Sequence, residues 1–178
     1  MPPPHRKTPV QYLHSIGFLD NAPALVGGNQ LSDTDLELIT KTKTKIIHSP
    51  RYNAHLNLGH PPLKKLRELG IPVALGTDAL ASLYSLSLWD EMRYIKDRYP
   101  ENDAPTAKDI LEMATIDGAK ALGLDKKIGS LEKGKEADFL IIHTPKDMAA
   151  SDLTSWLINN VTPREITSVF VAGKKVKI

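Results

Sequence analysis

Short apolar runs alternate with amphipathic stretches along the first two thirds of this sequence. Three of these runs, "APALV", "TKIIH" and "IPVAL", show no alternation of apolar and polar residues. Each is followed by residues whose apolar members recur at helical spacing, as Leu63, Leu66 and Leu69 do. Wholly apolar strands that alternate with helices are typical of a parallel sheet covered by helices. The pattern therefore predicts an α/β fold.

The helical periodicity predicts five helices and leaves one long loop. The expected helices are at 9–19, 31–42, 61–70, 87–99 and 106–124, and the expected loop is at 53–62. Ser32 followed by Asp35 is a capping-box pattern, which predicts the start of the second helix. Gly70 and Gly123 are natural helix ends.

The pattern changes after about residue 125, where turn glycines precede β-rich segments. Residues 139–142 read as a strand, and 166–178 as a hairpin that turns at Gly173-Lys174. The stretch 151–163 between them is compatible with a helix or an irregular loop. We therefore expect one domain over 1–125 and a small β unit over 126–178.

Composition narrows the class of protein without naming a function. The 178 residues are 41% hydrophobic and 25% charged, with a net charge of +2, which is typical of a globular protein and gives no argument for a nucleic-acid partner. The absence of cysteine excludes disulfides, thiolate zinc sites and Cys nucleophiles. No apolar run approaches the roughly 18 residues of a membrane span, and the first residues lack a signal-peptide core. A cytoplasmic location without membrane contact is expected.

One carboxylate stands out because it directly follows a predicted buried strand. Asp78 ends the run "IPVALGTD", at the end of a parallel strand where (β/α) barrels build their sites. A carboxylate there can ligate a metal ion and accept a proton from metal-bound water. The alternative is that Asp78 only shapes a turn.

Histidines and serines offer weaker candidates. His48 also ends a predicted strand, where its imidazole could bind metal, orient Asp78, contact substrate or simply pack in the core. A separate metal site of His48, His55 and His60 is a weak alternative. His55 and His60 are five residues apart, and this spacing does not place two side chains on the same face of a helix. Ser82 lies in no nucleophile elbow, so serine hydrolysis has no support.

The segment from 73 to 93 resembles the last barrel strand and following helix of the amidohydrolase superfamily, in its branch of chlorohydrolases and adenine-type deaminases. The residues that carry the resemblance are Gly76, Thr77, Asp78, Ala81, Ser82, Ser87-Leu88 and Glu91-Met92-Arg93. Residues 46–78 resemble the preceding strand, loop and helix, and "IGSLEKGKEADFLII" resembles a closing β-sandwich segment. The resemblance covers nearly the whole chain from about residue 24.

The resemblance implies a role for each matching residue. Asp78 would be the last metal ligand of the barrel and the acid/base for the attacking water. His48 and Ser82 would lie near the substrate. The cofactor would be a divalent metal, zinc or iron, and the substrate a small molecule whose aromatic ring carbon bears an amine or a halide.

Three departures from the family pattern limit this chain. It has no His-x-His for the first strand and no fifth-strand histidine motif. Gly27-Gly28-Asn29-Gln30 stands where the family usually has a His-Cys-Val-His or His-Cys-Val-Gln stretch. Three strands also cannot close a barrel of eight. The expected architecture is therefore a partial (β/α)8 barrel with its last three strands, followed by part of a β-sandwich.

The sequence thus favours the C-terminal portion of a metal-dependent amidohydrolase that hydrolyses C–N bonds. The look of "PPPHRKTPVQYL" and "SPRYNAHLNLG" favours a purine-nucleoside-like substrate, with aminofutalosine as one candidate. A non-catalytic scaffold is the first alternative, which the replacement at Gly27-Gly28 favours. The second is a subunit that complements a separate N-terminal half. Homo-oligomerisation, or association with the missing half, is expected.

Overall fold

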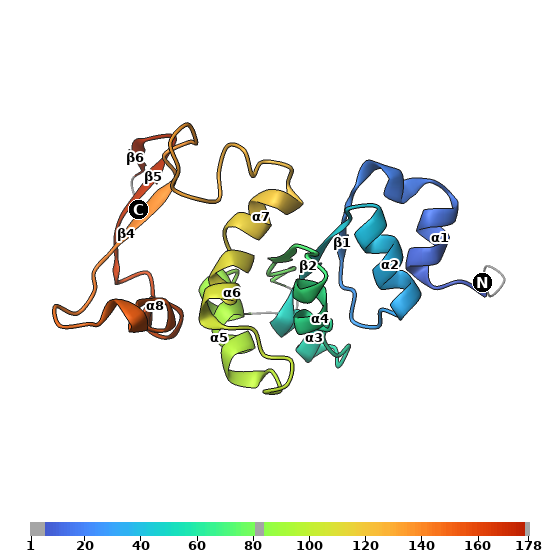
Figure 1. Ribbon diagram of the computed structural model, residues 1–178. Helices are drawn as coiled ribbons and strands as arrows, with labels where there is room; N and C mark the ends of the chain where they lie inside the picture. Colours follow the sequence, from blue (N-terminus) through green and yellow to red (C-terminus); the bar gives the residue numbers. More distant parts are fainter. Residues whose placement is uncertain (1–5, 81–83, 177–178) are drawn as a thin grey trace.

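Two three-stranded sheets organise the computed structural model, which describes residues 6–80 and 84–176 (Figure 1). The strands of the first sheet are β1 Ala24–Val26, β2 Lys45–His48 and β3 Val73–Leu75, and those of the second are β4 Phe139–Ile142, β5 Ile166–Val171 and β6 Lys174–Val176. The first sheet is parallel in the order β1-β2-β3, and the second is antiparallel in the order β4-β5-β6. The predicted α/β fold with a parallel sheet is confirmed.

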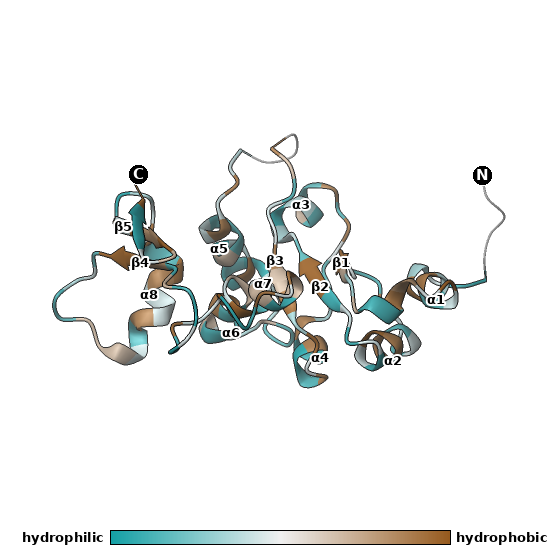
Figure 2. Cartoon of the chain, turned by 90° about the horizontal axis from the view of Figure 1, so that it is seen from above, coloured by the Kyte–Doolittle hydropathy of each residue, from teal (hydrophilic) through white to brown (hydrophobic). Residues whose placement is uncertain are grey.

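Helices pack around and between the two sheets. They are α1 Pro9–Ser15, η1 Phe18–Asn21, α2 Asp33–Lys41, α3 Pro50–His55, α4 Leu63–Glu68, α5 Leu88–Arg98, α6 Ala107–Met113, α7 Ile116–Ala121, η2 Ala150–Asp152 and α8 Leu153–Asn160. In both whole-chain views, α5, α6 and α7 lie between the parallel sheet and the antiparallel sheet (Figures 1 and 2). Among the described helices, none has the length and apolar character needed to cross a membrane.

The hydrophobic core lies between one face of the parallel sheet and the helices. Ile46 of β2 and Val73 of β3 are fully buried in register with each other. They pack in one cluster with apolar residues of α2, α4, α5 and α6, which include Leu36, Ile39, Leu63, Leu66, Met92, Ile95, Ile110 and Met113. The opposite face is less covered, since Val26 is 68% exposed. The parallel sheet therefore has one face that helices cover and one face that is partly open to solvent.

Capping boxes fix where α1 and α2 begin. The Ser32 hydroxyl accepts from the Asp35 N–H, and the Asp35 carboxylate accepts from the Ser32 N–H, as the sequence predicts. Thr8 forms the same arrangement with Gln11 at the start of α1. The Thr8 hydroxyl also donates to the buried Asp35 carboxylate, which joins the starts of α1 and α2.

The predicted helix at 106–124 is wrong in one respect, because the chain forms two helices there. Between α6 and α7, Thr115 adopts φ −127° and ψ −93°, which is outside the helical region. Its hydroxyl donates to the Leu111 carbonyl at 2.7 Å. A threonine that bonds back to the preceding turn competes with the regular helix, so the apolar periodicity alone does not reveal the break.

The predicted hairpin forms, but its turn is one residue earlier than expected. Ala172 and Gly173 both have positive φ, 49° and 74°, as a two-residue type I′ turn requires. Two contacts from the residues before β4 support this turn. The Asp138 carboxylate accepts from the Ala172 N–H at 2.6 Å, and the Ala137 carbonyl accepts from the Gly173 N–H at 3.0 Å.

The stretch that the sequence left open between helix and loop is helix α8, which packs against α5 and α6. Residues 122–138, between α7 and β4, form turns and irregular structure. The residues after 125 therefore contain both the antiparallel sheet and a helix that contacts the first part of the chain. The boundary between 1–125 and 126–178 stays a prediction.

Asp103, in the connection between α5 and α6, caps the start of α4. Its two carboxylate oxygens accept from the backbone N–H groups of Leu63 and Lys64, at 3.2 and 2.9 Å. The first N–H groups of a helix have no acceptor within that helix, and Pro62 at the N-cap of α4 provides no side-chain acceptor. We expect Asp103→Ala to lower the free energy of unfolding by about 1 kcal/mol in urea denaturation. Asp97→Ala, at an exposed position of α5, is the control; equal losses in both variants would contradict the capping role.

Candidate functional site

The carboxyl ends of the three parallel strands meet at one edge of the first sheet. They lead into Gly27–Asn29 after β1, Ser49 after β2 and Gly76–Asp78 after β3. The Gly76 N–H donates to the His48 carbonyl at 2.9 Å, and so continues the pairing beyond the assigned strands. This edge is where an open α/β sheet or barrel places a site. The candidate site residues lie here.

Asp78 presents an exposed carboxylate from a left-handed backbone. Its φ is +57°, and its Oδ1 accepts from the Ala79 N–H at 2.7 Å. Aspartate is one of the few non-glycine residues that tolerate this conformation, because its short side chain can hydrogen-bond locally. The position of Asp78 at the end of β3 agrees with the sequence prediction, and its metal-binding and catalytic roles stay predictions.

His48 lies on the covered face of the sheet, with no exposed surface. Side chains along β2 alternate between the two faces of the sheet. His48 therefore lies on the same face as the core residue Ile46, and Lys45 and Ile47 lie on the other face. Its Nε2 is hydrogen-bonded to the Tyr99 hydroxyl, and its Nδ1 lies 3.2 Å from the Asn53 side-chain nitrogen. Because that amide nitrogen can only donate, Nδ1 accepts and Nε2 carries the proton.

A series of side-chain hydrogen bonds thus links the core to the edge of the site. Asn53 of α3 donates from its side-chain amide to Asn29 Oδ1 at 2.9 Å, as well as to His48. Asn29 is half-buried and follows β1. In this geometry the His48 ring is closed off from solvent, which favours a packing role over the predicted substrate contact. The substrate role of His48 stays a prediction.

Burial has a consequence for how stability varies with pH. It lowers the pKa of His48 from 6.5 to about 3, with a smaller contribution from the nearby His60. Between these values the unfolded chain binds a proton that the folded chain does not, so stability is full above pH 6.5 and falls as the pH drops. We expect a slope of up to about 1.4 kcal/mol per pH unit from this residue. Urea denaturation from pH 7.5 to 5.5 measures it, and His48→Gln should flatten the slope; an unchanged slope would contradict the assignment.

The other predicted residues are distributed as follows. Ser82 lies outside the described residues. His55 ends α3, so the predicted loop at 53–62 is wrong at its start, where Pro50 opens a short helix that the pattern did not reveal. His60 lies against Tyr99 and Asp103, with its Nδ1 3.4 Å from Asp103 Oδ2. Over 6–80 and 84–176, no three His, Cys, Asp or Glu side chains could hold a metal ion, so the site of His48, His55 and His60 is wrong.

An ion pair beside this edge was missed by the sequence prediction. Glu91 of α5 is fully buried, and its carboxylate accepts from both the backbone N–H and the Nε of Arg51, at 3.0 and 2.8 Å. Burial raises the pKa of Glu91, and the bonds from Arg51 oppose that rise. The available signal was helical spacing, because Glu91 falls on the same face of α5 as Ile95.

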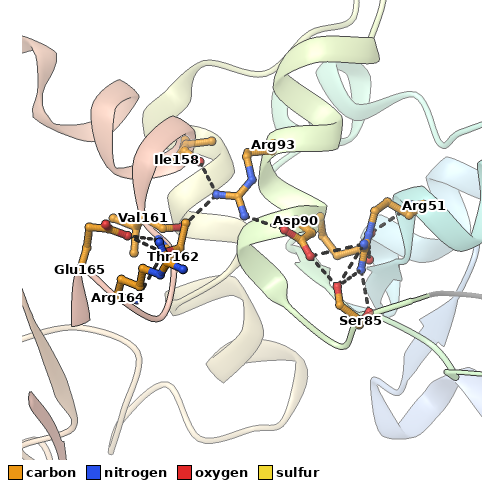
Figure 3. Close-up of polar contacts among 10 residues, drawn as sticks. Arg51, Ser85, Asp90, Arg93, Ile158, Val161, Thr162, Arg164 and Glu165 are labelled. Carbon is orange, nitrogen blue, oxygen red and sulfur yellow. Dashed lines mark hydrogen bonds and ion pairs between the residues drawn. The ribbon is translucent and has the colours of Figure 1, made fainter. Parts of the chain in front are cut away.

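The guanidinium of Arg51 also holds the segment that precedes α5 (Figure 3). Its Nη2 donates to the Ser85 carbonyl at 2.8 Å, and the Ser85 hydroxyl donates to Asp90 Oδ2 at 2.5 Å. Asp90 lies between two arginines, since Arg93 Nη2 donates to its other oxygen at 2.6 Å. Burial raises the pKa of Asp90, but the bonds from Ser85 and Arg93 outweigh it and leave the pKa below its usual value.

Arg93 extends the same network to the C-terminal part of the chain. Its Nη1 donates to the carbonyls of Ile158 and Val161, at 3.3 and 3.0 Å (Figure 3). These carbonyls are at the end of α8, where helix acceptors lack partners within the helix. The segment Glu91-Met92-Arg93 therefore joins three parts: Glu91 holds α3, Met92 lies in the core, and Arg93 holds α8.

Comparison with known proteins gives relatives that include nucleoside deaminases. A deaminase of 5-methylthioadenosine and S-adenosylhomocysteine from Saccharophagus degradans is 38% identical over 172 residues, which are 93% of this chain and 39% of that enzyme. A zinc-bound adenosine deaminase from Xanthomonas campestris has a TM-score of 0.84 and 30% identity, over 95% of this chain and 40% of that one. Aminofutalosine deaminase from Helicobacter pylori has a TM-score of 0.75 and 28% identity, over 92% and 41%.

The chain therefore spans about 40% of the length of these relatives. In contrast, the sequence profile of the amidohydrolase family matches almost all of this sequence, over residues 4–176. The parallel sheet, the helices that cover it and the segment around Asp78 are all within that match. The chain belongs to the amidohydrolase family.

Proposed function

We propose that this chain is part of a metal-dependent hydrolase that deaminates a purine-nucleoside-like substrate. The observation that carries the proposal is the exposed carboxylate of Asp78 at the carboxyl end of β3, in a family whose matched relatives are named as deaminases. In the reaction, the oxygen of water bonds to the ring carbon and the C–N bond breaks. Ammonia leaves, and a ring carbonyl remains.

Asp78 would have two tasks in this reaction. A divalent ion, zinc or iron, would when bound lower the pKa of a water molecule. Asp78 would provide one carboxylate ligand for that ion and accept the proton of the attacking water. Ser82 and His48 would lie near the substrate. The described residues offer Asp78 without two further ligands beside it, whereas a catalytic zinc site needs about three protein ligands.

The remaining ligands would come from polypeptide outside this sequence. A (β/α)8 barrel needs eight parallel strands, and the described parallel sheet has three, with β1 and β3 as its outer strands. In this proposal 1–125 supply the last three strands of the barrel. Residues 126–178, with the antiparallel sheet, supply part of a β-sandwich. The partner is the rest of the fold, in the same or a separate chain, and homo-oligomers of the whole are compatible with it.

Reconstitution with a relative tests the proposal. We would co-express the 178 residues with the part of the Saccharophagus degradans enzyme that they do not match, and purify the complex. Ammonia release would be measured with 5′-methylthioadenosine, S-adenosylhomocysteine, 5′-deoxyadenosine and aminofutalosine, and metal content by mass spectrometry. Bound metal with release from at least one nucleoside is expected. A stable complex with neither metal nor activity would contradict the proposal.

That negative result would favour a non-catalytic scaffold. In its favour is the stretch Gly27–Asn29, which stands where the family pattern that the sequence resembles usually has a histidine. Gly27 and Gly28 both have positive φ, 103° and 79°, and a Cβ added at Gly28 would contact the side chains of Leu31 and Ile46. Restoring a histidine at Gly27 would meet open space but a strained backbone.

A further inference from the structure

Asn29 is the first residue after β1 with a side chain that can contact a ligand at the carboxyl edge of the sheet. The two residues before it, Gly27 and Gly28, have no side chain. The Gly27 N–H donates to the Ile47 carbonyl at 2.9 Å, which continues the pairing of β1 with β2 and fixes where the loop begins. The half-buried Asn29 therefore follows directly from the sheet.

The side-chain amide of Asn29 has its oxygen bound and its nitrogen free. Its Oδ1 accepts from Asn53 Nδ2 at 2.9 Å. Within residues 6–80 and 84–176, no group accepts from its Nδ2. The oxygen and the nitrogen lie on opposite sides of a planar amide. The nitrogen, with its two N–H donors, is therefore turned away from Asn53.

Asn53 holds this orientation because it also donates to His48. It is a buried residue of α3, and the Nδ2 that donates to Asn29 lies 3.2 Å from His48 Nδ1. Burial lowers the pKa of His48 to about 3, so at neutral pH the ring is uncharged and one of its nitrogens accepts. The two N–H bonds of the Asn53 amide thus serve His48 and Asn29 together. An aspartate at this position would have no donor for either.

A cavity of about 550 Å³ lies beside Asn29, and its wall is mostly apolar. Val10, Leu25, Leu31 and Leu58 are among the residues that line it. Cavities of this size, with apolar walls and a few placed polar groups, are typical of small-molecule sites. Because Asn29 adds an amide with free donors to this wall, a fitting ligand has an apolar body and a hydrogen-bond acceptor.

We propose that Asn29 binds the substrate through its side-chain N–H donors, and that Asn53 and the neutral His48 are positioning residues that keep those donors turned away from the core. A purine nucleoside has the required chemistry, since its ring has an apolar face and acceptor nitrogens. β1 and β3 are two strand spacings apart, about 10 Å, and a nucleoside is long enough to reach from Asn29 to Asp78. The substrate contact rests on the proposed function, whereas the orientation of the amides does not.

NMR of the 178-residue chain tests the orientation of the amides. We expect ¹⁵N shifts of His48 that place its proton on Nε2, and Asn53 side-chain protons that exchange with water more slowly than those of Asn29. In Asn53→Asp the carboxylate can only accept, so the His48 proton should move to Nδ1. Asn160→Asp, the same change at an exposed residue of α8, should leave the His48 shifts unchanged. A proton on Nδ1 in the unaltered chain would overturn the orientation, even if Asn53→Asp does not fold.

Asn29→Asp tests the substrate contact in the reconstituted complex. Aspartate keeps an oxygen that accepts from Asn53, and it replaces the free nitrogen with a second oxygen that cannot donate. We expect KM to rise about ten- to a hundredfold with little change in kcat, as for a contact made equally in the bound substrate and in the transition state. Asn160→Asp should leave both constants near those of the unaltered complex.

The outcomes separate this contact from the proposed function. An active complex with unchanged KM in Asn29→Asp would overturn the substrate contact and leave the proposed function in place. A complex that is inactive with every nucleoside would overturn both, while the His48 shifts still decide the orientation of the amides. Urea denaturation checks folding: if Asn29→Asp loses as much stability as Asn53→Asp, the rise in KM reflects lost structure, and the contact is overturned.

Discussion

Asp78→Asn is expected to lower the deamination rate of the reconstituted complex by about 10²- to 10⁴-fold, the usual contribution of a general acid or base. The amide cannot accept the proton of the attacking water, and as a neutral group it is a weaker metal ligand than a carboxylate. Steady-state ammonia release measures the rate, and mass spectrometry measures the metal content. Both should fall together if Asp78 has both roles.

The asparagine variant separates chemistry from folding. Asparagine tolerates the left-handed region as well as aspartate does, and Asp78 is exposed, so stability should change by less than about 0.5 kcal/mol. Asp97→Asn makes the same charge change on the exposed part of α5 and should leave activity intact. An Asp78→Asn complex that keeps more than half of the activity would remove Asp78 from the catalytic machinery.

Arg51→Met is expected to lower the free energy of unfolding by about 3 kcal/mol, the lower end of the range for removing one partner of a buried ion pair. The lower end applies because Arg51 is 19% exposed, although the Glu91 side chain is fully buried. Methionine fills the volume of the arginine stem and keeps the backbone N–H of residue 51 as a donor, but it removes the guanidinium donor and the positive charge that face the Glu91 carboxylate. Urea denaturation at pH 7 measures the loss.

The double variant Arg51→Met, Glu91→Met shows whether the loss of stability in Arg51→Met comes from an uncompensated buried charge or from lost packing. With both charged groups gone, no carboxylate remains uncompensated, and much of the lost stability should return. Glu91→Met alone should cost less than Arg51→Met, because the remaining guanidinium reaches Ser85 and Asp90 at the surface. If the double variant is less stable than Arg51→Met, packing rather than the buried charge explains the loss.

Local pattern was sufficient for the parallel sheet and for the capping box at Ser32. The runs that contain Ile46 and Val73 are strands because their apolar residues are buried in register, and Ser32 with Asp35 marks the start of α2. The break at Thr115 and the short helix α3 were not visible, because one depends on a single back-bonding hydroxyl and the other lacks the repeated leucine spacing that marks α4. Periodicity needs about two turns to be detected.

For the site, the sequence could place Asp78 but not what surrounds it. The end of an apolar strand is a local feature, so Asp78 was visible without any structure. The bond between Arg51 and Glu91 joins residues 40 apart, and nothing in either neighbourhood points to the other. His48 illustrates the converse: its position at the end of an apolar run left a metal ligand, a substrate contact and core packing open, and only the structure shows that alternation along β2 directs its ring into the core.

The contact of Arg93 with the end of α8 has a consequence for the order in which the chain folds. Arg93 lies 68 residues before Val161, whose carbonyl it binds. During synthesis the guanidinium therefore emerges long before its acceptors, and α5 stays without this contact until the ribosome has released α8. Contacts of such sequence separation form late, because loop closure costs entropy before they contribute. Nascent chains that end before 161 should accordingly be protease-sensitive around α5, with resistance appearing once α8 has docked.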